Sequence, residues 1–178
     1  MRTVIVYESM FGNTEHVARA VAAGFESAGS VTAVLDVAAA GPGVLADCDV
    51  LVVGGPTHGF SMSRRSTRDS AVQQGAAPAH APTGLREWLD GLDAAGKPHV
   101  AAAVFDTRID KVRHLPGSAA RRAVKRLRRR GLVMLDHPTS FYVTDLKGPL
   151  ADGETERAHA WGRRLAEMAG ATPSGVTS

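Results

Sequence analysis

Short apolar runs and longer amphipathic segments alternate along the chain, which is the pattern of an α/β protein. Apolar and β-branched residues dominate five segments that we predict to be strands: residues 3–7, 31–36, 50–53, 99–105, and a fifth strand that begins at 132–135, breaks at Pro138 and resumes at 141–143. The runs at 50–53 and 99–105 are apolar almost throughout, which is typical of strands buried on both faces of a parallel sheet.

Helical spacing of apolar residues predicts four amphipathic helices between these strands. They cover residues 13–28, ended by Gly29; 83–92, with Thr83 as N-cap; 118–130, capped by Ser118 and closed by Gly131; and 152–168, with Ala158, Trp161, Leu165 and Met168 facing inward. Strands that alternate with helices predict a doubly wound, five-stranded parallel sheet with helices on both faces. We therefore predict one α/β domain over residues 1–170 and a disordered tail over 171–178.

Three polar or glycine-rich segments follow predicted strands, at residues 8–14, 54–63 and 105–113. In a doubly wound sheet, ligands bind at the carboxyl ends of the strands, at the point where the strand order reverses. These segments are therefore expected to meet at one ligand-binding edge. Residues 61–82 are polar, basic and rich in Ala and Pro, and they are long for a loop, so a short helix is expected within them.

The junction between the first strand and the first helix has the features of an anion site. Backbone N–H groups and the positive end of a helix dipole converge there, and Ser9, Asn13 and Thr14 add side-chain donors. No Lys or Arg lies between Thr3 and Thr14, and neither a GxxxxGK[ST] loop nor a GxGxxG turn is present. These features predict a phosphate that is held and not transferred; the alternative is an ordinary N-capped turn.

Composition narrows the class of protein further. The chain has 178 residues, of which 44% are hydrophobic, and this suits one globular domain. Its single Cys48 cannot form an internal disulfide and fits a reducing compartment. No apolar run approaches a membrane span, and the N-terminal run is too short for a signal peptide. We therefore expect a cytoplasmic protein without a membrane partner, and no clustered His, Cys and Asp indicates a metal site.

The net charge of +3 has a local origin. Seven of the ten residues from Arg121 to Arg130 are Lys or Arg. This segment is either a solvated helix face or a docking face for an acidic partner or a nucleic acid. Nucleic acid is the less favoured partner, because no aromatic residue that could stack on bases lies in the segment.

On these motifs the chain resembles the flavodoxins over residues 2–169. Ser9-Met10-Phe11-Gly12-Asn13-Thr14 is similar to the phosphate loop of that family, roughly T/S-x-T-G-x-T, with Phe11 standing where a hydroxyl is usual. Gly54-Gly55-Pro56-Thr57-His58-Gly59 resembles the second flavin loop, and Gly148-Pro149-Leu150 with Gly153-Glu154 resembles the segment before the last helix. The resemblance implies FMN as cofactor and the strand order 2-1-3-4-5, with FMN at the switch point between strands one and three.

The resemblance also implies which residues bind the cofactor. The FMN phosphate would be held by residues of the first loop: Ser9, Met10, Phe11, Gly12, Asn13 and Thr14. The isoalloxazine would lie along Pro56, Thr57, His58, Gly59 and Phe60, and its far side and pyrimidine edge would be lined by Phe105, Asp106, Thr107 and Arg108. Arg108 is expected near the N1/O2 edge, with a solvent-facing Arg as the alternative.

The chain departs from the usual flavodoxin pattern at the ring. Flavodoxins often sandwich the ring between Trp and Tyr, whereas here only Phe60 and His58 offer stacking in the second loop. In the third loop Phe105 is either a ring contact or the last buried residue of its strand. A less covered ring predicts weaker FMN binding. Flavodoxins are also commonly acidic, whereas this chain is basic.

Three functions fit these observations. The first is an electron carrier between redox partners, docking through charged surface. The second is an NAD(P)H-dependent FMN or quinone reductase, although nothing in the sequence marks a nicotinamide site or a catalytic side chain. The third is a module with weak or no FMN binding that serves as an interaction domain. We rank the carrier first.

Overall fold

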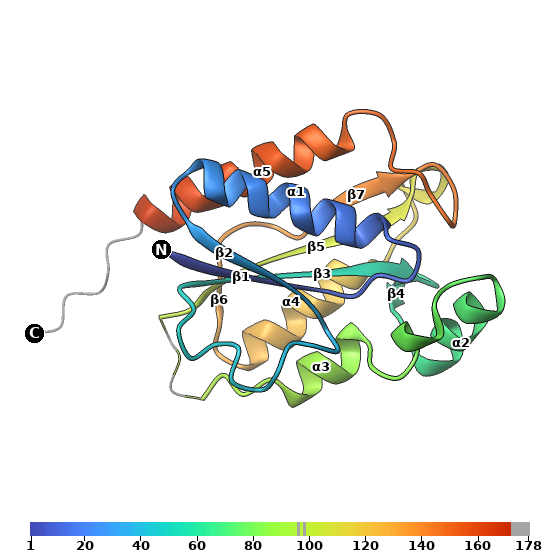
Figure 1. Ribbon diagram of the computed structural model, residues 1–178, viewed down its shortest axis with the longest axis horizontal. Coiled ribbons are helices and arrows are strands. Elements are labelled where there is room, and N and C mark those ends of the chain that lie inside the picture. Colours follow the sequence, from blue (N-terminus) through green and yellow to red (C-terminus); the bar gives the residue numbers. More distant parts are fainter. Residues whose placement is uncertain (96, 98, 172–178) are drawn as a thin grey trace, which may run out of the picture.

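A seven-stranded sheet forms the centre of the molecule (Figure 1). The computed structural model describes residues 1–95, 97 and 99–171. Its parallel strands are β1 (Arg2–Tyr7), β2 (Val31–Asp36), β3 (Val50–His58), β5 (Ala101–Ile109), β6 (Val133–Met134) and β7 (Thr139–Val143). The order is β2-β1-β3-β5-β6, with β7 also on β5, and the short β4 (Ser61–Met62) pairs antiparallel with β3.

The predicted fold class is confirmed, although the sheet has seven strands and not five. The predicted fifth strand is present in two pieces, since β6 pairs with Ala101 and Ala102 at the start of β5, and β7 pairs further along, from Phe105 to Ile109. β4 is the other addition. The strand order reverses between β1 and β3, and this places the switch point at their carboxyl ends.

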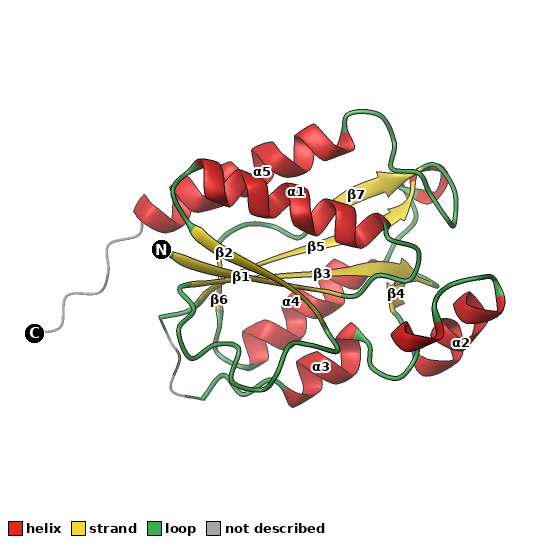
Figure 2. Cartoon of the chain, viewed as in Figure 1, coloured by secondary structure: helices red, strands yellow, loops and turns green. Residues whose placement is uncertain are grey.

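Helices cover both faces of the sheet (Figure 2). One face carries α1 (Asn13–Ser27) and α5 (Glu154–Ala171), which lie side by side, and the other carries α3 (Leu85–Gly91) and α4 (Ala119–Arg129). The helix α2 (Arg65–Gln73) lies at one end of the molecule, after β4, and short 3₁₀ turns occupy Pro78–His80 and Asp110–Val112. Among the described residues no helix is long and apolar enough to cross a membrane.

The core on the α1 and α5 side is built from aromatic rings and close helix packing. Phe105, Phe141 and Trp161 form three edge-to-face pairs with centroids 5.8 to 6.2 Å apart. α1 and α5 approach each other at Gly24 and Gly162, where a Cβ on Gly162 would lie 2.2 Å from the carbonyl oxygen of Val21. Only glycine allows this contact between two helix backbones.

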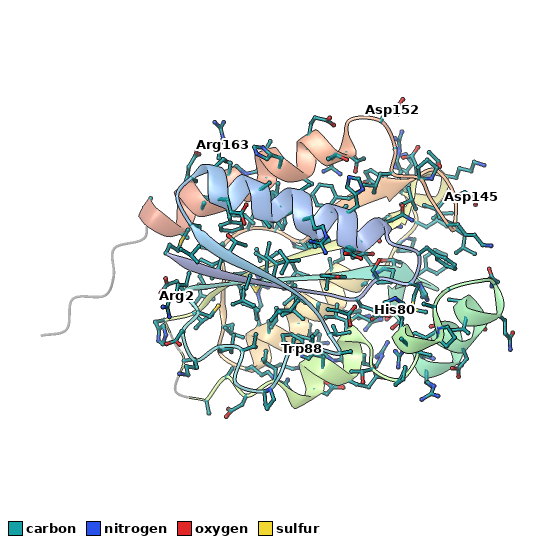
Figure 3. The ribbon with its side chains drawn as sticks, in the orientation of Figure 1. Arg2, His80, Trp88, Asp145, Asp152 and Arg163 are labelled. Atoms are coloured by element: carbon teal, nitrogen blue, oxygen red, sulfur yellow. The ribbon has the colours of Figure 1, made fainter. Side chains whose placement is uncertain are left out.

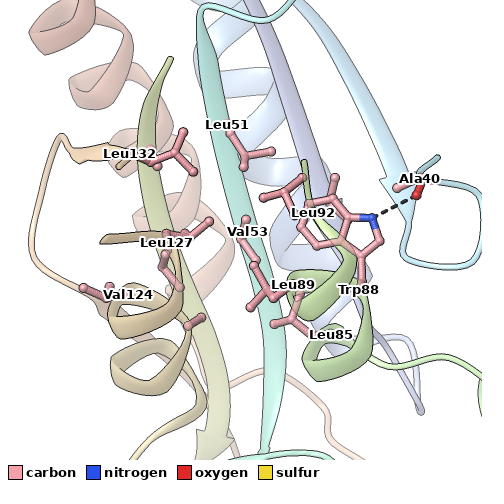
Figure 4. Close-up of a cluster of buried hydrophobic side chains, with 14 of the residues drawn as sticks. Ala40, Leu51, Val53, Leu85, Trp88, Leu89, Leu92, Val124, Leu127 and Leu132 are labelled. Atoms are coloured by element: carbon pink, nitrogen blue, oxygen red, sulfur yellow. Dashed lines mark hydrogen bonds between the residues drawn. The ribbon is translucent and has the colours of Figure 1, made fainter. Parts of the chain in front are cut away.

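The core on the other face is aliphatic (Figure 4). Leu51 and Val53 of β3 pack with Leu89 of α3 and Leu127 of α4, all fully or almost fully buried. The indole of Trp88 closes this layer, and its N–H donates to the carbonyl oxygen of Ala40 at 2.9 Å. The buried indole donor is therefore satisfied.

Several predicted boundaries differ from the structure. β3 and β5 continue past their apolar runs to His58 and Ile109, because their ladder persists as far as the pair Pro56 and Thr107. Thr83 is not the N-cap of α3: Gly84 is, and its N–H donates to Glu87 Oε2. A side chain at 84 would collide with the guanidinium of Arg68.

The predictions for the last two helices are mostly confirmed. Ser118 caps α4 and accepts a hydrogen bond from the Arg121 N–H at 3.1 Å. Along α5, Ala158, Trp161 and Leu165 are buried, but Met168 is 38% exposed, so its predicted inward position is wrong. α5 also runs through Ala171, the first residue of the predicted tail, and the remaining residues of that tail, 172–178, lie outside the described residues.

Candidate functional site

The loop between β1 and α1 is shaped as an anion site. Beyond the end of β1, the N–H of Glu8 donates to the carbonyl oxygen of Gly54 at 3.0 Å, and residues 9–12 turn into α1. Gly12 is the N-cap residue, with a left-handed φ of 86°, and no side chain caps the helix. The first N–H groups of α1 are therefore available to a ligand, together with the positive end of the helix dipole.

Two hydroxyl groups extend this donor set. Ser9 Oγ is buried and has no hydrogen-bond partner within the described residues. Thr14 Oγ1, in the first turn of α1, shares a 2.7 Å hydrogen bond with Thr107 Oγ1 of β5. A buried hydroxyl without a partner is costly, so Ser9 points to a ligand that accepts its hydrogen bond.

A segment remote in sequence closes the other side of the loop. The side-chain amide of Asn13 donates to the carbonyl oxygen of Lys147 at 3.0 Å. Gly148 packs so closely that a Cβ there would lie 2.4 Å from Asn13 Oδ1. The turn after β7, which also carries Asp145, reaches the carboxyl edge of the sheet (Figure 3) and fixes the orientation of Asn13.

Two adjoining cavities lie at this edge. The smaller, of about 60 Å³, is lined by the first loop together with Thr107 and Val143. The larger, of about 270 Å³, is bounded by the β3–β4 turn, by Ile109 and Val112, and by Ala71 of α2. Both cavities share the side chains of Phe11, Thr57, His58, Arg108, Ile109 and Leu146, so they adjoin across a common set of residues.

The structure brings most of the predicted site residues together around this space. Ser9, Met10, Phe11, Asn13, Thr14, Pro56, Thr57, His58, Gly59, Phe60, Thr107 and Arg108 line one cavity or both. Gly12 shapes the first loop from its N-cap position. Phe105 and Asp106 line neither cavity.

Phe105 has the alternative position that the sequence allowed, in the core. The expected loop at 105–113 begins as strand, and the Phe105 side chain points to the α1 and α5 face, where it is fully buried. Its ring packs against Phe141 and Trp161, and Gly54 on the adjacent strand leaves the space for it. Phe105 is therefore a core residue.

Asp106 also lies away from both cavities. Side chains alternate along β5, so Asp106 points to the face covered by α4 and is fully buried there. Its Oδ2 accepts hydrogen bonds from Thr57 Oγ1 at 2.9 Å and from the N–H of Ala120 at 3.0 Å. Asp106 thus connects the N-terminus of α4 to Thr57 of β3, which lines both cavities.

Arg108 is a wall of both cavities and not a solvent-facing residue. It is buried, and its Nη2 donates to the carbonyl oxygens of Val112 and Leu115 at 2.8 and 3.1 Å. Its Nε is buried without a partner in the described residues. Arg108 therefore orders the turn after β5 and retains one donor for a ligand.

The turn between β3 and β4 is a tight hairpin. His58 pairs with Ser61, and both residues between them have positive φ, 53° at Gly59 and 63° at Phe60. This is the backbone of a type I′ turn, and it is strained for a bulky residue such as Phe. Phe60 is also 47% exposed, so the strained ring lies at the surface beside the larger cavity.

Among the described residues, His58 is the one histidine that lines these two cavities. Burial lowers the pKa of its imidazole, and the charge of Arg68 lowers the pKa further. The ring is therefore kept neutral at pH 7. It can accept or donate a hydrogen bond there, but it is a poor source of a proton.

The segment 61–82 is fastened by a buried polar network. Arg68 is only 1% exposed; its guanidinium donates to Ala81 O and Ser63 Oγ and lies 3.2 Å from Glu87 Oε2. Glu8, directly before the first loop, accepts the Leu85 N–H at 2.7 Å. Burial raises the pKa of the Glu8 carboxyl, and its Oε1 has no partner within the described residues. The network joins the first loop, α2 and α3.

Sequence reasoning missed the apolar walls of the larger cavity. These are Ile109, Val112 and Leu146, with Ala71 of α2; Thr67 of α2 and its C-cap residue Gln74 add polar groups to the lining. Ile109 and Leu146 stand as single apolar residues within polar segments after predicted strands, which was the available signal. The face of α2 could not be assigned, because the packing of residues 61–82 depends on the buried Arg68.

The comparison with protein families decides the relationship. The family model for flavodoxin matches residues 5–161. The chain belongs to the flavodoxin family. No curated protein matches the chain in sequence.

Solved flavodoxin structures share the fold at low sequence identity. A flavodoxin from the domain Archaea is 18% identical with a TM-score of 0.65, covering 96% of this chain and 99% of its own. Oxidised flavodoxin 1 from Bacillus cereus is 20% identical with a TM-score of 0.68, covering 94% and 98%. Rubredoxin oxygen:oxidoreductase from Desulfovibrio gigas is 17% identical with a TM-score of 0.68; the match covers 98% of this chain but 37% of that larger protein.

Flavodoxin family membership implies FMN as the cofactor, and the residues present fit it. The uncapped N-terminus of α1 and the unpartnered Ser9 hydroxyl suit a phosphate held by neutral donors. The apolar walls of the larger cavity suit a flavin ring, and Arg108 Nε suits its polar edge. No Trp or Tyr lines either cavity among the described residues, so Phe11, His58 and Phe60 are the available ring contacts.

Proposed function

We propose that this flavodoxin-like protein is an FMN-dependent electron carrier that exchanges electrons with redox partner proteins. The observation that carries the proposal is the pair of cavities, in which a small pocket at the β1–α1 loop adjoins a mostly apolar pocket beside the exposed Phe60. FMN supplies the redox chemistry when bound, while the protein binds, orients and shields it. An exposed edge of the bound flavin ring would permit electron transfer to a docked protein.

The side chains around the cavities support a carrier over a reductase of small molecules. No Asp or Glu lines either cavity among the described residues, and His58 is held neutral. A reductase that delivers hydride and proton to a substrate needs a proton donor near the ring. The roles of these residues toward FMN remain those that the family resemblance implies.

The first test compares FMN with riboflavin, which lacks the phosphate. Ser9→Ala removes the unpartnered hydroxyl, and we expect it to weaken FMN binding about tenfold, the value of one hydrogen bond to a charged group. Riboflavin binding should not change. Ser27→Ala is the matched control, because Ser27 Oγ donates to Gly24 O at the far end of α1. Quenching of flavin fluorescence measures both affinities.

The second test separates the carrier from the reductase. The loaded protein is reduced with light and then with NADPH, and its visible absorption is followed. Reduction in two separate one-electron steps, with no bleaching by NADPH, supports the carrier. Bleaching by NADPH followed by reoxidation with a quinone contradicts it and favours the reductase, and a colourless protein that FMN does not stabilise contradicts both.

A further inference from the structure

The positive charge of this protein is concentrated in one helix. Seven Lys and Arg residues and no acid lie between Arg121 and Arg130, while the whole chain has a net charge of +3, so the rest of the chain is net acidic. On α4 the cations Arg121, Arg122, Lys125, Arg128 and Arg129 are all exposed. Within the described residues, none of these five has a carboxylate within salt-bridge distance.

Helix stability does not explain the cations at the start of α4. Arg128 and Arg129 lie in the last turn, where positive charge interacts favourably with the helix dipole. Arg121 and Arg122 lie in the first turn, where the dipole opposes positive charge, and no acidic residue is present there to compensate. A solvated face would accommodate cations anywhere along the helix, whereas this arrangement costs stability at one end.

That end of α4 adjoins the exposed hairpin. Gly117 lies directly before the cap of α4, and a Cβ on it would lie 2.6 Å from the carbonyl oxygen of Phe60. The exposed Leu115 is on the same segment. The first turn of α4, which carries Arg121 and Arg122, therefore begins beside the hairpin residue Phe60, which lines the larger cavity.

Further cations flank the hairpin through β4. Arg86 of α3 donates to Ser63 O and Met62 O, on and beside β4. Burial lowers the pKa of Arg86, and the nearby charges of Arg126 and Arg64 lower it further. Arg64, Arg86, Arg121 and Arg122 thus lie on the segments that flank the hairpin, and together with Phe60 we call these five residues the basic hairpin surface.

We infer that the basic hairpin surface docks an acidic redox protein. The inference rests on the proposed function for the redox character of the partner, and on charge for its acidity. An exposed apolar Phe60 with cations on the neighbouring segments suits a partner that carries carboxylates around its own redox centre. A nucleic acid is the less favoured occupant, because Phe60 is the one exposed aromatic residue among those described and α4 presents none.

The test uses a matched pair of charge reversals on the same helix. Arg121→Glu with Arg122→Glu changes the first turn, and Arg128→Glu with Arg129→Glu makes the same change of charge seven residues later. This separation is about 10 Å along the helix, about one Debye length at ~0.1 M salt. An acidic [2Fe–2S] ferredoxin, labelled with a fluorophore, is the protein probe, and a DNA duplex of the same label is the second probe.

We expect the first-turn variant to weaken ferredoxin binding about tenfold at ~0.1 M salt, and the last-turn variant to weaken it much less. The first-turn variant should also melt at a higher temperature than the unaltered protein, since Glu suits a helix N-terminus, and the last-turn variant at a lower one. Loss of ferredoxin affinity in a more stable protein cannot come from misfolding. Bound ferredoxin should protect amides of residues 58–60 from hydrogen exchange.

Three results contradict the inference: equal effects of the two variants, no salt-sensitive ferredoxin binding, or tighter binding of the duplex than of ferredoxin. The last of these would assign the surface to nucleic acid. A titration of the same samples with FMN measures cofactor binding independently of ferredoxin binding. Failure to bind FMN removes the proposed function but leaves the docking measurement valid, because ferredoxin binding is measured without electron transfer.

Discussion

The two helical layers on the sheet differ in how they pack and in how they balance charge. α1 and α5 meet backbone to backbone at Gly24 and Gly162, and their exposed cations have neighbouring acids, as in Arg19 with Glu15 and Arg163 with Glu167. The outward-pointing Arg163 is visible in Figure 3. α3 and α4 pack through leucines, and the outer face of α4 carries cations without acids. The layer of α1 and α5 is thus closely packed with balanced surface charges, whereas the layer of α3 and α4 combines an aliphatic core with a positively charged surface.

This difference shows how one sheet serves two purposes. The α1 and α5 layer holds the start of α1, and with it the phosphate loop, against a closely packed backbone. The α3 and α4 layer positions the hairpin, since Asp106 and Thr57 bind the N-terminus of α4. Changes in the first layer should therefore alter stability, and changes on the surface of the second should alter recognition.

The largest effect is expected at the contact between α1 and α5. Gly162→Ala places a Cβ 2.2 Å from Val21 O, so the helices must separate, and we expect a loss of about 4 kcal/mol in the free energy of unfolding. Gly170→Ala on the same helix is the control, because nothing lies within 4 Å of its Cβ; it should be neutral or stabilise by about 0.5 kcal/mol. Urea denaturation measures both, and equal effects would contradict the packing described.

An intermediate effect is expected at the link between the phosphate loop and α3. Burial raises the pKa of Glu8 above its ordinary value of 4.5, so the folded state binds a proton more tightly than the unfolded state. The free energy of unfolding should therefore fall as the pH rises from about 4.5 through the raised pKa, and change no further above it.

Glu8→Gln removes this titration and keeps an acceptor for the Leu85 N–H. The free energy of unfolding of the variant, minus that of the unaltered protein, should therefore be larger at pH 8 than at pH 4.5. Urea denaturation over this range provides the measurement, with Glu26→Gln, on the exposed surface of α1, as the control. A stability difference that does not vary with pH would show that Glu8 titrates normally.

The smallest effect is expected from the outer face of α4. Lys125→Glu places an acid four residues from both Arg121 and Arg129, which creates in α4 the kind of pair that α1 already has. We expect a gain of about 0.3–0.5 kcal/mol per pair at low salt, reduced at high salt. Thermal denaturation at two salt concentrations tests this. An unchanged stability would mean that the cations of α4 do not repel one another.

The sequence was sufficient for the fold because its strands and helices are locally marked. Apolar runs at 50–53 and the capping Ser118 predict β3 and α4 without tertiary information. The phosphate loop was predictable for the same reason, since a glycine N-cap with hydroxyl neighbours is a local signal. Its placement beside Thr107 and Asn13's contact with Lys147 needed the structure.

The end of β5 was harder to predict, because this strand continues into residues 105–109, whose composition is typical of a loop. The side-chain alternation of β5 sends Phe105 to one face and Asp106 to the other, and an error in where the strand ends misplaces both. The short helix expected within residues 61–82 is present as α2. Its packing could not be predicted, because the buried Arg68 organises it and a buried arginine cannot be distinguished from an exposed one by sequence pattern.

The hydrogen bond from Asn13 to Lys147 joins positions 134 residues apart. When only the first four strands have emerged from the ribosome, every residue of the loop around Ser9 has been made. The segment around Lys147, which binds Asn13, has not yet been made. Cofactor capture during synthesis should therefore await emergence of the segment around Lys147.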